Sequence, residues 1–134
     1  MAQSTETLPN GLQLLQDDRF FKLGQDSVLL SAFAKPRRNA KLLDLGCGTG
    51  ALALLVWRPD LKITGLELQD GPLDLFRQSI TANELENVTA LQGDLRQMRT
   101  LLPHGSMDYV ICNPPYFDRN AGANAPTTEK RTAR

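Results

Sequence analysis

Three glycines that alternate with other residues form the most distinctive chemical pattern in the chain: Gly46, Gly48 and Gly50. An acid, Asp44, lies two positions before the first of them, within a short apolar segment that is typical of a buried strand. An apolar run that follows the last glycine is typical of a helix. This layout indicates a nucleotide-type cofactor site, because glycine lets a ligand approach the backbone closely. The alternative is an ordinary strand-to-helix turn that is rich in glycine.

Two further acids lie at or just after the ends of predicted strands, at positions suited to holding a nucleoside. Glu67 comes about twenty residues after the glycines, where a carboxylate can accept hydrogen bonds from both ribose hydroxyls. Its neighbours Leu66 and Leu68 make an unpaired acid costly, which favours this role over a solvated acid at a strand end. Asp94 follows the next predicted strand, where it can accept a hydrogen bond from an adenine amino group, cap the following helix, or do both.

The tetrapeptide Asn113-Pro114-Pro115-Tyr116 predicts the reaction centre. Two consecutive prolines fix the backbone and remove two N–H donors. The Asn113 side-chain oxygen and the Pro114 carbonyl can then accept both hydrogens of a planar amino group, which turns its nitrogen lone pair toward an electrophile. Tyr116 offers a flat ring on which a planar acceptor can stack. The alternative is a Pro-Pro turn that closes a strand, with Tyr116 as ordinary packing.

A parallel sheet is the element that can bring these residues together. Four short apolar runs are typical of strands, and helical patterns separate them: residues 42–45, 61–68, 88–91 and 107–112. This alternation predicts an α/β fold with a doubly wound, mostly parallel sheet. Ligands bind such sheets at the carboxyl ends of the strands, where the glycines and the polar residues above all fall.

The segment before the glycines, residues 1–40, is expected to form a hairpin and a helix that lead into a cofactor domain at residues 41–116. The hairpin is expected to turn at Asp17-Asp18, with strands within residues 12–16 and 19–23. The helix is expected to have Asp26 as its N-cap and one apolar face, made of Leu29, Leu30 and Phe33. Residues 117–134 are polar and rich in turn formers, which predicts a disordered tail.

Composition and length indicate the number of domains and which kinds of partner, metal site and membrane segment to expect. The 134 residues suit a single domain, and 15 basic residues balance 15 acidic ones, so no overall field favours a polyanion. Cys47 and Cys112 have no metal or redox spacing and are expected to be buried, and His104 has no partner at ligand spacing. We therefore expect no metal. The absence of a signal peptide or an apolar run of membrane length predicts a soluble, cytoplasmic protein.

The pattern Asp-x-Gly-x-Gly-x-Gly resembles the first motif of class I S-adenosylmethionine methyltransferases, and differs from the G-x-G-x-x-G of dinucleotide dehydrogenases. With Asn-Pro-Pro-Tyr, the chain resembles the N6-adenine and N5-glutamine branch of that class. Residues 21–30 and the final Thr132-Ala133-Arg134 make it most similar to the tRNA1(Val) N6-adenine methyltransferase family. The resemblance implies S-adenosylmethionine as cofactor and tRNA as substrate.

The resemblance also assigns roles to residues. In the family, the segment that matches Gln25 and Asp26 holds the methionine end of the cofactor, and the matching acids hold the ribose and the adenine. The implied cofactor-binding residues are Gln25, Asp26, Asp44, Gly46, Cys47, Gly48, Gly50, Glu67, Leu68, Asp94, Leu95 and Asn113. The implied catalytic residues are Asn113, Pro114, Pro115 and Tyr116.

One departure from the family concerns length. The family's sheet has seven strands, whereas this chain is predicted to stop after the fourth, which leaves residues 107–112 as an apolar edge and predicts no turnover by the chain alone. Two alternatives to a tRNA methyltransferase stay open. One is a protein-glutamine N5-methyltransferase, although that family carries a helical substrate domain for which the first 40 or so residues leave no room. The other is a non-catalytic fragment that binds the cofactor weakly or not at all.

Overall fold

The computed structural model describes residues 3–20, 24–103 and 105–112 of the 134-residue chain. A parallel sheet forms its centre, with the strand order β5-β4-β3-β6. Its strands are β3 (Lys41–Leu45), β4 (Lys62–Glu67), β5 (Val88–Gln92) and β6 (Tyr109–Cys112). The predicted α/β fold class is confirmed, and all four predicted strands lie within two residues of their expected bounds at either end.

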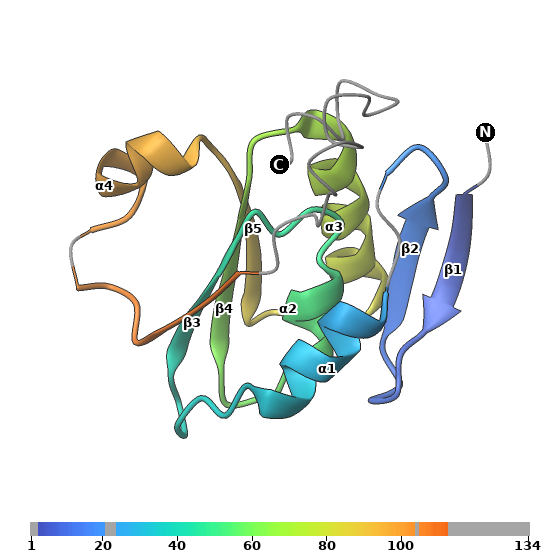
Figure 1. Cartoon of the computed structure of the whole chain (residues 1–134), viewed down its shortest axis with the longest axis horizontal. Helices are drawn as coiled ribbons and strands as arrows, with labels where there is room; N and C mark the ends of the chain where they lie inside the picture. The colour runs from blue at the N-terminus through green and yellow to red at the C-terminus, as the bar shows by residue number, and fades with distance from the viewer. Residues whose placement is uncertain (1–2, 21–23, 104, 113–134) are drawn as a thin grey trace, which may run out of the picture.

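Helices cover both faces of this sheet (Figure 1). One face carries α1 (Gln25–Phe33), α2 (Ala51–Leu55) and α3 (Asp70–Ala82), and the other carries the 3-10 turn η1 (Leu95–Gln97) and the short α4 (Met98–Leu101). Alternate strand residues such as Leu42 and Ile63 point toward the first face and form the main core with α2 and α3. The predicted stripe of α3 is confirmed, since Leu73 and Phe76 are fully buried and Ile80 packs against the core.

The hairpin lies earlier in the chain than predicted. It pairs β1 (Gln3–Thr7) with β2 (Gln13–Asp17) in antiparallel register, and turns around Gly11, which has a φ of +90°. The Leu8 amide donates to the Leu12 carbonyl across that turn, at 2.8 Å. Asp18 and Arg19 do form a turn, but it leads out of the hairpin. The prediction chose the apolar residues after position 17, whereas the actual partner of β2 is a polar, fully exposed strand.

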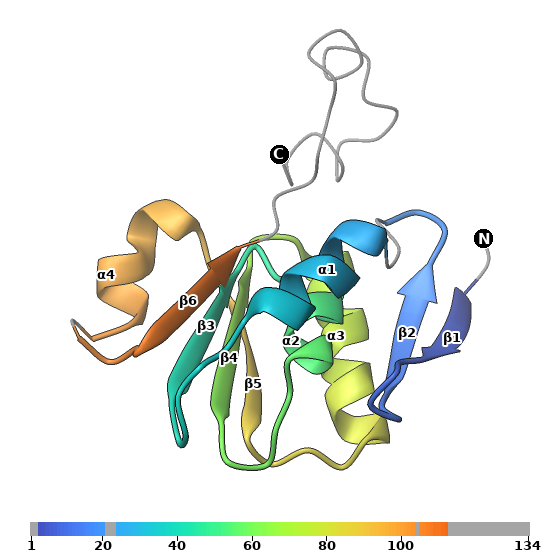
Figure 2. The same cartoon turned by 60° about the horizontal axis from the view of Figure 1, so that its bottom comes forward.

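The hairpin packs on the outer side of α3, as Figure 2 shows. Side chains of α3 and its C-cap bond the edge of β2 that β1 leaves free. The Leu15 amide donates to Ser79 Oγ at 2.9 Å, and the Gln13 amide donates to Asn83 Oδ1 at 2.8 Å. Asn83 Nδ2 returns a bond to the Gln13 carbonyl at 2.7 Å. The hairpin is therefore joined to α3 by specific hydrogen bonds.

The first helix differs from the prediction in two ways. Its N-cap is Gly24, and Asp26 lies inside the first turn. The expected apolar face is largely exposed, because Leu29 and Phe33 keep 57% and 77% of their surface while Leu30 packs against the core. The spacing of apolar residues therefore predicted the helix correctly, but it did not predict which side of the helix packs against the rest of the protein.

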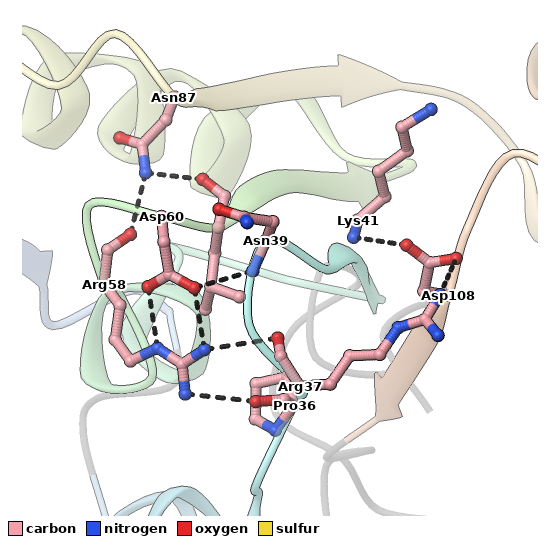
Figure 3. Close-up of polar contacts among 9 residues, drawn as sticks. Pro36, Arg37, Asn39, Lys41, Arg58, Asp60, Asn87 and Asp108 are labelled. Atoms are coloured by element: carbon pink, nitrogen blue, oxygen red, sulfur yellow. Dashed lines mark hydrogen bonds and ion pairs between the residues drawn. The ribbon is translucent and has the colours of Figure 1, made fainter.

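Polar side chains tie together the connections at the amino end of the sheet (Figure 3). Arg58 forms a bidentate ion pair with Asp60 and also donates to the carbonyls of Pro36 and Arg37. Asn87 donates to the carbonyls of Arg58 and Leu61 at 2.9 and 2.7 Å. These bonds hold the loops that precede β3, β4 and β5, and so fix the strands whose opposite ends carry the predicted site.

Candidate functional site

The glycine loop that links β3 to α2 leaves part of its backbone uncovered. Gly46, Gly48 and Gly50 all have positive φ angles, of 64°, 57° and 89°. A Cβ added to Gly50 would lie 2.1 Å from the Phe76 ring, so this glycine is required for packing. Among the described residues, a Cβ added to Gly46 or Gly48 would meet nothing within 4 Å. The first two glycines therefore border open space. A ligand can contact the backbone closely only at such positions.

Glu67 holds this loop in shape. It is buried at the carboxyl end of β4, and its Oε1 accepts a hydrogen bond of 2.8 Å from the Gly48 amide. Oε2 accepts one of 3.0 Å from the Gln69 amide. A carboxylate has about four acceptor positions, and the described residues occupy two of them. The bond to Gly48 was not predicted, because only the fold reveals that the two residues meet.

Asp44 lies on β3, directly before the loop. It is 1% exposed, and its Oδ2 has no hydrogen-bond partner among the described residues. Burial raises the pKa of this carboxyl to about 8, and the nearby Glu67 adds to the shift, while a hydrogen bond from the Ala53 amide opposes it. An unsatisfied buried acid beside open glycines fits a ligand that brings a positive charge to this end of the sheet.

Asp94 follows β5 and caps η1, which confirms the capping role. Its Oδ1 accepts from the Arg96 amide at 2.9 Å, and its Oδ2 forms an ion pair of 2.6 Å with the Arg96 guanidinium. The hydrogen bonds from Arg96 lower the pKa of Asp94 to about 2. The carboxylate is therefore ionised and engaged by Arg96. The prediction missed this partner, although the Asp-x-Arg spacing at a helix start was a signal for it.

The remaining cofactor candidates surround the same end of the sheet. Leu68 and Leu95 follow β4 and β5 and expose about half of their surface. Gln25 and Asp26 begin α1 and are exposed, and Figure 2 shows this helix running back from the carboxyl end of the sheet to the start of β3. Cys47 in the loop is buried as expected, whereas Cys112 is exposed, which corrects that prediction.

The predicted catalytic residues Asn113, Pro114, Pro115 and Tyr116 lie outside the described residues. The residue before them, Cys112, ends β6 in register with Leu45, which precedes the glycine loop on β3.

The described part of the chain also forms a cavity away from the glycine loop. This cavity, of about 580 Å³, lies on the sheet face opposite α1, where Leu43, Leu45 and Val110 line it together with residues of α4. It is therefore separate from the face that carries α1, α2 and α3, toward which Asp44 points. Residues 3–20, 24–103 and 105–112 contain no group of three or more His, Cys, Asp or Glu side chains that could hold a metal ion. None of the helices in those ranges has the length and apolarity needed to cross a membrane.

The chain is similar to curated tRNA-modifying enzymes. It is 34% identical over 105 residues to the tRNA1(Val) (adenine(37)-N6)-methyltransferase of Pseudoalteromonas translucida, a match that covers 77% of this chain and 44% of the relative. The protein of the same name from Photobacterium profundum is 32% identical over 114 residues, covering 81% and 47%. The chain thus spans less than half the length of these curated relatives.

The fold also matches a solved structure. The tRNA (uracil-54, C5)-methyltransferase of Pyrococcus abyssi, in complex with S-adenosyl-L-homocysteine, superimposes with a TM-score of 0.66 at 15% identity, over 86% of this chain and 29% of that one. Residues 24–130 match the model of the methyltransferase small domain. The open glycines and the buried acids beside them fit the predicted cofactor. The chain therefore belongs to the methyltransferase small domain family.

Proposed function

We propose that the chain holds S-adenosylmethionine at the glycine loop and takes part in methylating an exocyclic amino nitrogen, most specifically N6 of an adenine in tRNA. The observation that carries this proposal is the sequence Asn113-Pro114-Pro115-Tyr116 directly after β6. The strand that leads into it is in register with the strand that leads into the glycine loop. Parallel strands side by side deliver the residues that follow them to one edge of the sheet.

In this proposal the two ends of the cofactor meet different parts of the chain. Gly46 and Gly48 border the space for the methionine end of the cofactor. Glu67 uses its two remaining acceptor positions for the ribose hydroxyls of the nucleoside end. Asp94 accepts a bond from the adenine amino group, which requires it to share its oxygens with Arg96. Further contacts are proposed for Gln25, Asp26, Cys47, Gly50, Leu68 and Leu95.

When bound, the cofactor supplies a methyl group on an activated sulfonium. The chain's own part is then to position the acceptor and to stabilise charge. The Asn113 side-chain oxygen and the Pro114 carbonyl accept the two amine hydrogens, which orients the nitrogen lone pair and stabilises the positive charge that develops on it. Pro115 keeps that backbone rigid, and the Tyr116 ring stacks on the base.

The choice of tRNA follows the names of the curated relatives. An amide nitrogen of a protein glutamine presents a similar planar –NH2 group, so chemistry alone does not separate the two acceptors. The proposal therefore takes tRNA as the acceptor from the names of these relatives, and the assay below separates it from a protein amide.

A methylation assay tests the proposal. The 134-residue chain, and any longer product of the same gene, is incubated with labelled S-adenosylmethionine and either unmodified tRNA or a release factor. We expect label in N6-methyladenine of tRNA from the longer product and none from the 134-residue chain alone. In the longer product, Asn113→Ala should remove turnover while most of the cofactor affinity measured by calorimetry is kept, because the lost bonds act in the transition state. Label in the release factor alone would replace the substrate, and full turnover by Asn113→Ala would refute the catalytic assignment.

A further inference from the structure

Asp44 is a buried carboxyl group for which the proposed reaction has no use. The register pairs it with Gly65 on β4 and Ile111 on β6, so its side chain points toward the layer of helices. It is 1% exposed, and its Oδ2 has no partner among the described residues. Burial and the neighbouring Glu67 raise its pKa to about 8. At neutral pH this acid is mostly protonated in the ligand-free protein.

The groups that face Asp44 do not include a cation in the described part of the chain. Glu67 faces it from the end of β4, and the thiols of Cys47 in the glycine loop and Cys112 on β6 have pKa values raised in part by it. From α2 it receives only the Ala53 amide. A positive charge that enters beside these groups is therefore the event that would ionise Asp44.

The two ligands of a methyltransferase differ in charge. S-adenosylmethionine carries a sulfonium and an ammonium against a single carboxylate, whereas S-adenosylhomocysteine has a neutral thioether in place of the sulfonium. We propose that Asp44 makes the site at the glycine loop sensitive to this difference: Asp44 gives up its proton when the cationic methyl donor binds, and keeps it when the product, which has no net charge, binds. This proposal rests on the cofactor role proposed above.

The proton balance is simple. When the donor binds, the Asp44 O–H bond breaks, its electron pair stays on the carboxylate, and the proton passes to the buffer. When the product replaces the donor, the carboxylate takes a proton back. Because the ligand-free group titrates near pH 8, each increase of one pH unit in the range below pH 8 should increase the affinity for the donor about tenfold. The affinity for the product should stay nearly constant over the same range.

Calorimetry on the 134-residue chain tests this. Heats of binding are measured at pH 7 in two buffers of different ionisation enthalpy, which yields the protons released per ligand. We expect the wild type to release about 0.9 proton more than Asp44→Asn with S-adenosylmethionine, and the two proteins to agree with S-adenosylhomocysteine. Subtracting the variant removes any proton that comes from the ligand. Asp74→Asn, the same change at an exposed position of α3, should behave as wild type.

A second measurement needs no ligand. The folded pKa of Asp44 is raised above its value of 3.8 in the unfolded chain, so the native state binds the extra proton between about pH 4 and pH 8, and stability falls as the pH rises through that window. The urea midpoint of wild type should therefore drop relative to that of Asp44→Asn between pH 5 and pH 8. Parallel midpoints would overturn the proposal.

The outcomes separate this proposal from the one on which it rests. Donor binding with the same proton release in wild type and Asp44→Asn overturns the role of Asp44 and leaves the proposed function standing. No donor binding by either protein would refute the cofactor role and this proposal together. The role of Asp44 would also be overturned if wild type released more protons than Asp44→Asn with both donor and product, because the site would then not distinguish the charges of the two ligands.

Discussion

Glu67 connects the shape of the glycine loop to the ligand that the loop is proposed to hold. Its carboxylate accepts hydrogen bonds from the amides of Gly48 in the loop and Gln69 after β4. A single side chain therefore positions the loop and offers acceptors to the ligand. This explains why an acid can be buried at the end of β4 without a cation, since charge-assisted bonds to amides offset the loss of hydration.

Replacing this acid should impair both tasks. Glu67→Ala should weaken S-adenosylmethionine binding by about 1–3 kcal/mol in calorimetry, the range for losing hydrogen bonds to a charged group. It should also speed hydrogen exchange at the Gly48 amide, which loses its acceptor. Glu86→Ala removes an exposed acid at the other end of the sheet and should change neither quantity. Unchanged affinity in Glu67→Ala would remove this residue from the site.

Two glycines of the loop should respond differently to the same substitution. Gly48→Ala should cost about 1 kcal/mol of stability, because the left-handed conformation strains an alanine but its Cβ meets open space. Gly50→Ala adds a collision with the Phe76 ring and should cost roughly 2–4 kcal/mol. Urea denaturation of the two variants measures the difference. Equal costs would contradict the packing of Phe76 under the loop.

Residue spacing was sufficient to find the glycines and Glu67, because a cofactor loop requires those types close together in sequence. It was not sufficient to find what the side chains do without ligand. The Gly48 amide reaches Glu67 only because β3 and β4 are paired, and the Asp94–Arg96 ion pair depends on how η1 begins. Asp44 could be identified as a motif residue, but its missing hydrogen bond follows from packing alone.

At the scale of elements, the hairpin depends on α3 for its position. β1 is polar and exposed along its whole length, so it contributes little apolar burial. β2 is held by Ser79 and Asn83, whose side chains bond its backbone at Leu15 and Gln13. A two-stranded hairpin is marginally stable by itself, so these bonds should decide whether it stays ordered.

Removing the Asn83 side chain tests this dependence. It bonds the Gln13 amide and carbonyl and also the Ser79 carbonyl at 2.7 Å. Asn83→Ala should lower the free energy of unfolding by about 1–3 kcal/mol and speed hydrogen exchange at the Gln13 amide. Gln78→Ala, which alters an exposed side chain of the same helix, is the matched control. Unchanged exchange at Gln13 would mean that the hairpin is held in another way.

Strands and helices of the central sheet could be predicted because their apolar runs repeat at regular spacing and glycine or proline separates them. The hairpin and α1 could not be placed as well, for a physical reason. Pairing of β1 with β2 is directed by the turn at Gly11 and by bonds to α3, and β1 has no apolar pattern. The apolar residues of α1 include Leu29 and Phe33, which nothing in the described residues covers.

At the scale of the whole molecule, β6 is an edge of the described sheet and carries exposed apolar surface. Val110 keeps 54% of its surface, and Cys112 is exposed as well. The formal net charge is zero at pH 7, so copies of the chain do not repel one another through overall charge. An apolar edge strand on a neutral protein favours association between copies.

A charge placed on this edge should reduce that association. Val110→Lys puts a cation on the exposed centre of β6, where it would have to be buried if two edges paired, so light scattering should rise with protein concentration less steeply than in wild type. Val28→Lys makes the same change of charge at an exposed position on α1. If the edge is responsible, Val110→Lys should suppress scattering and Val28→Lys should have a much smaller effect. Equal suppression by both variants would assign the association to net charge, and no suppression by Val110→Lys would exclude β6 as its cause.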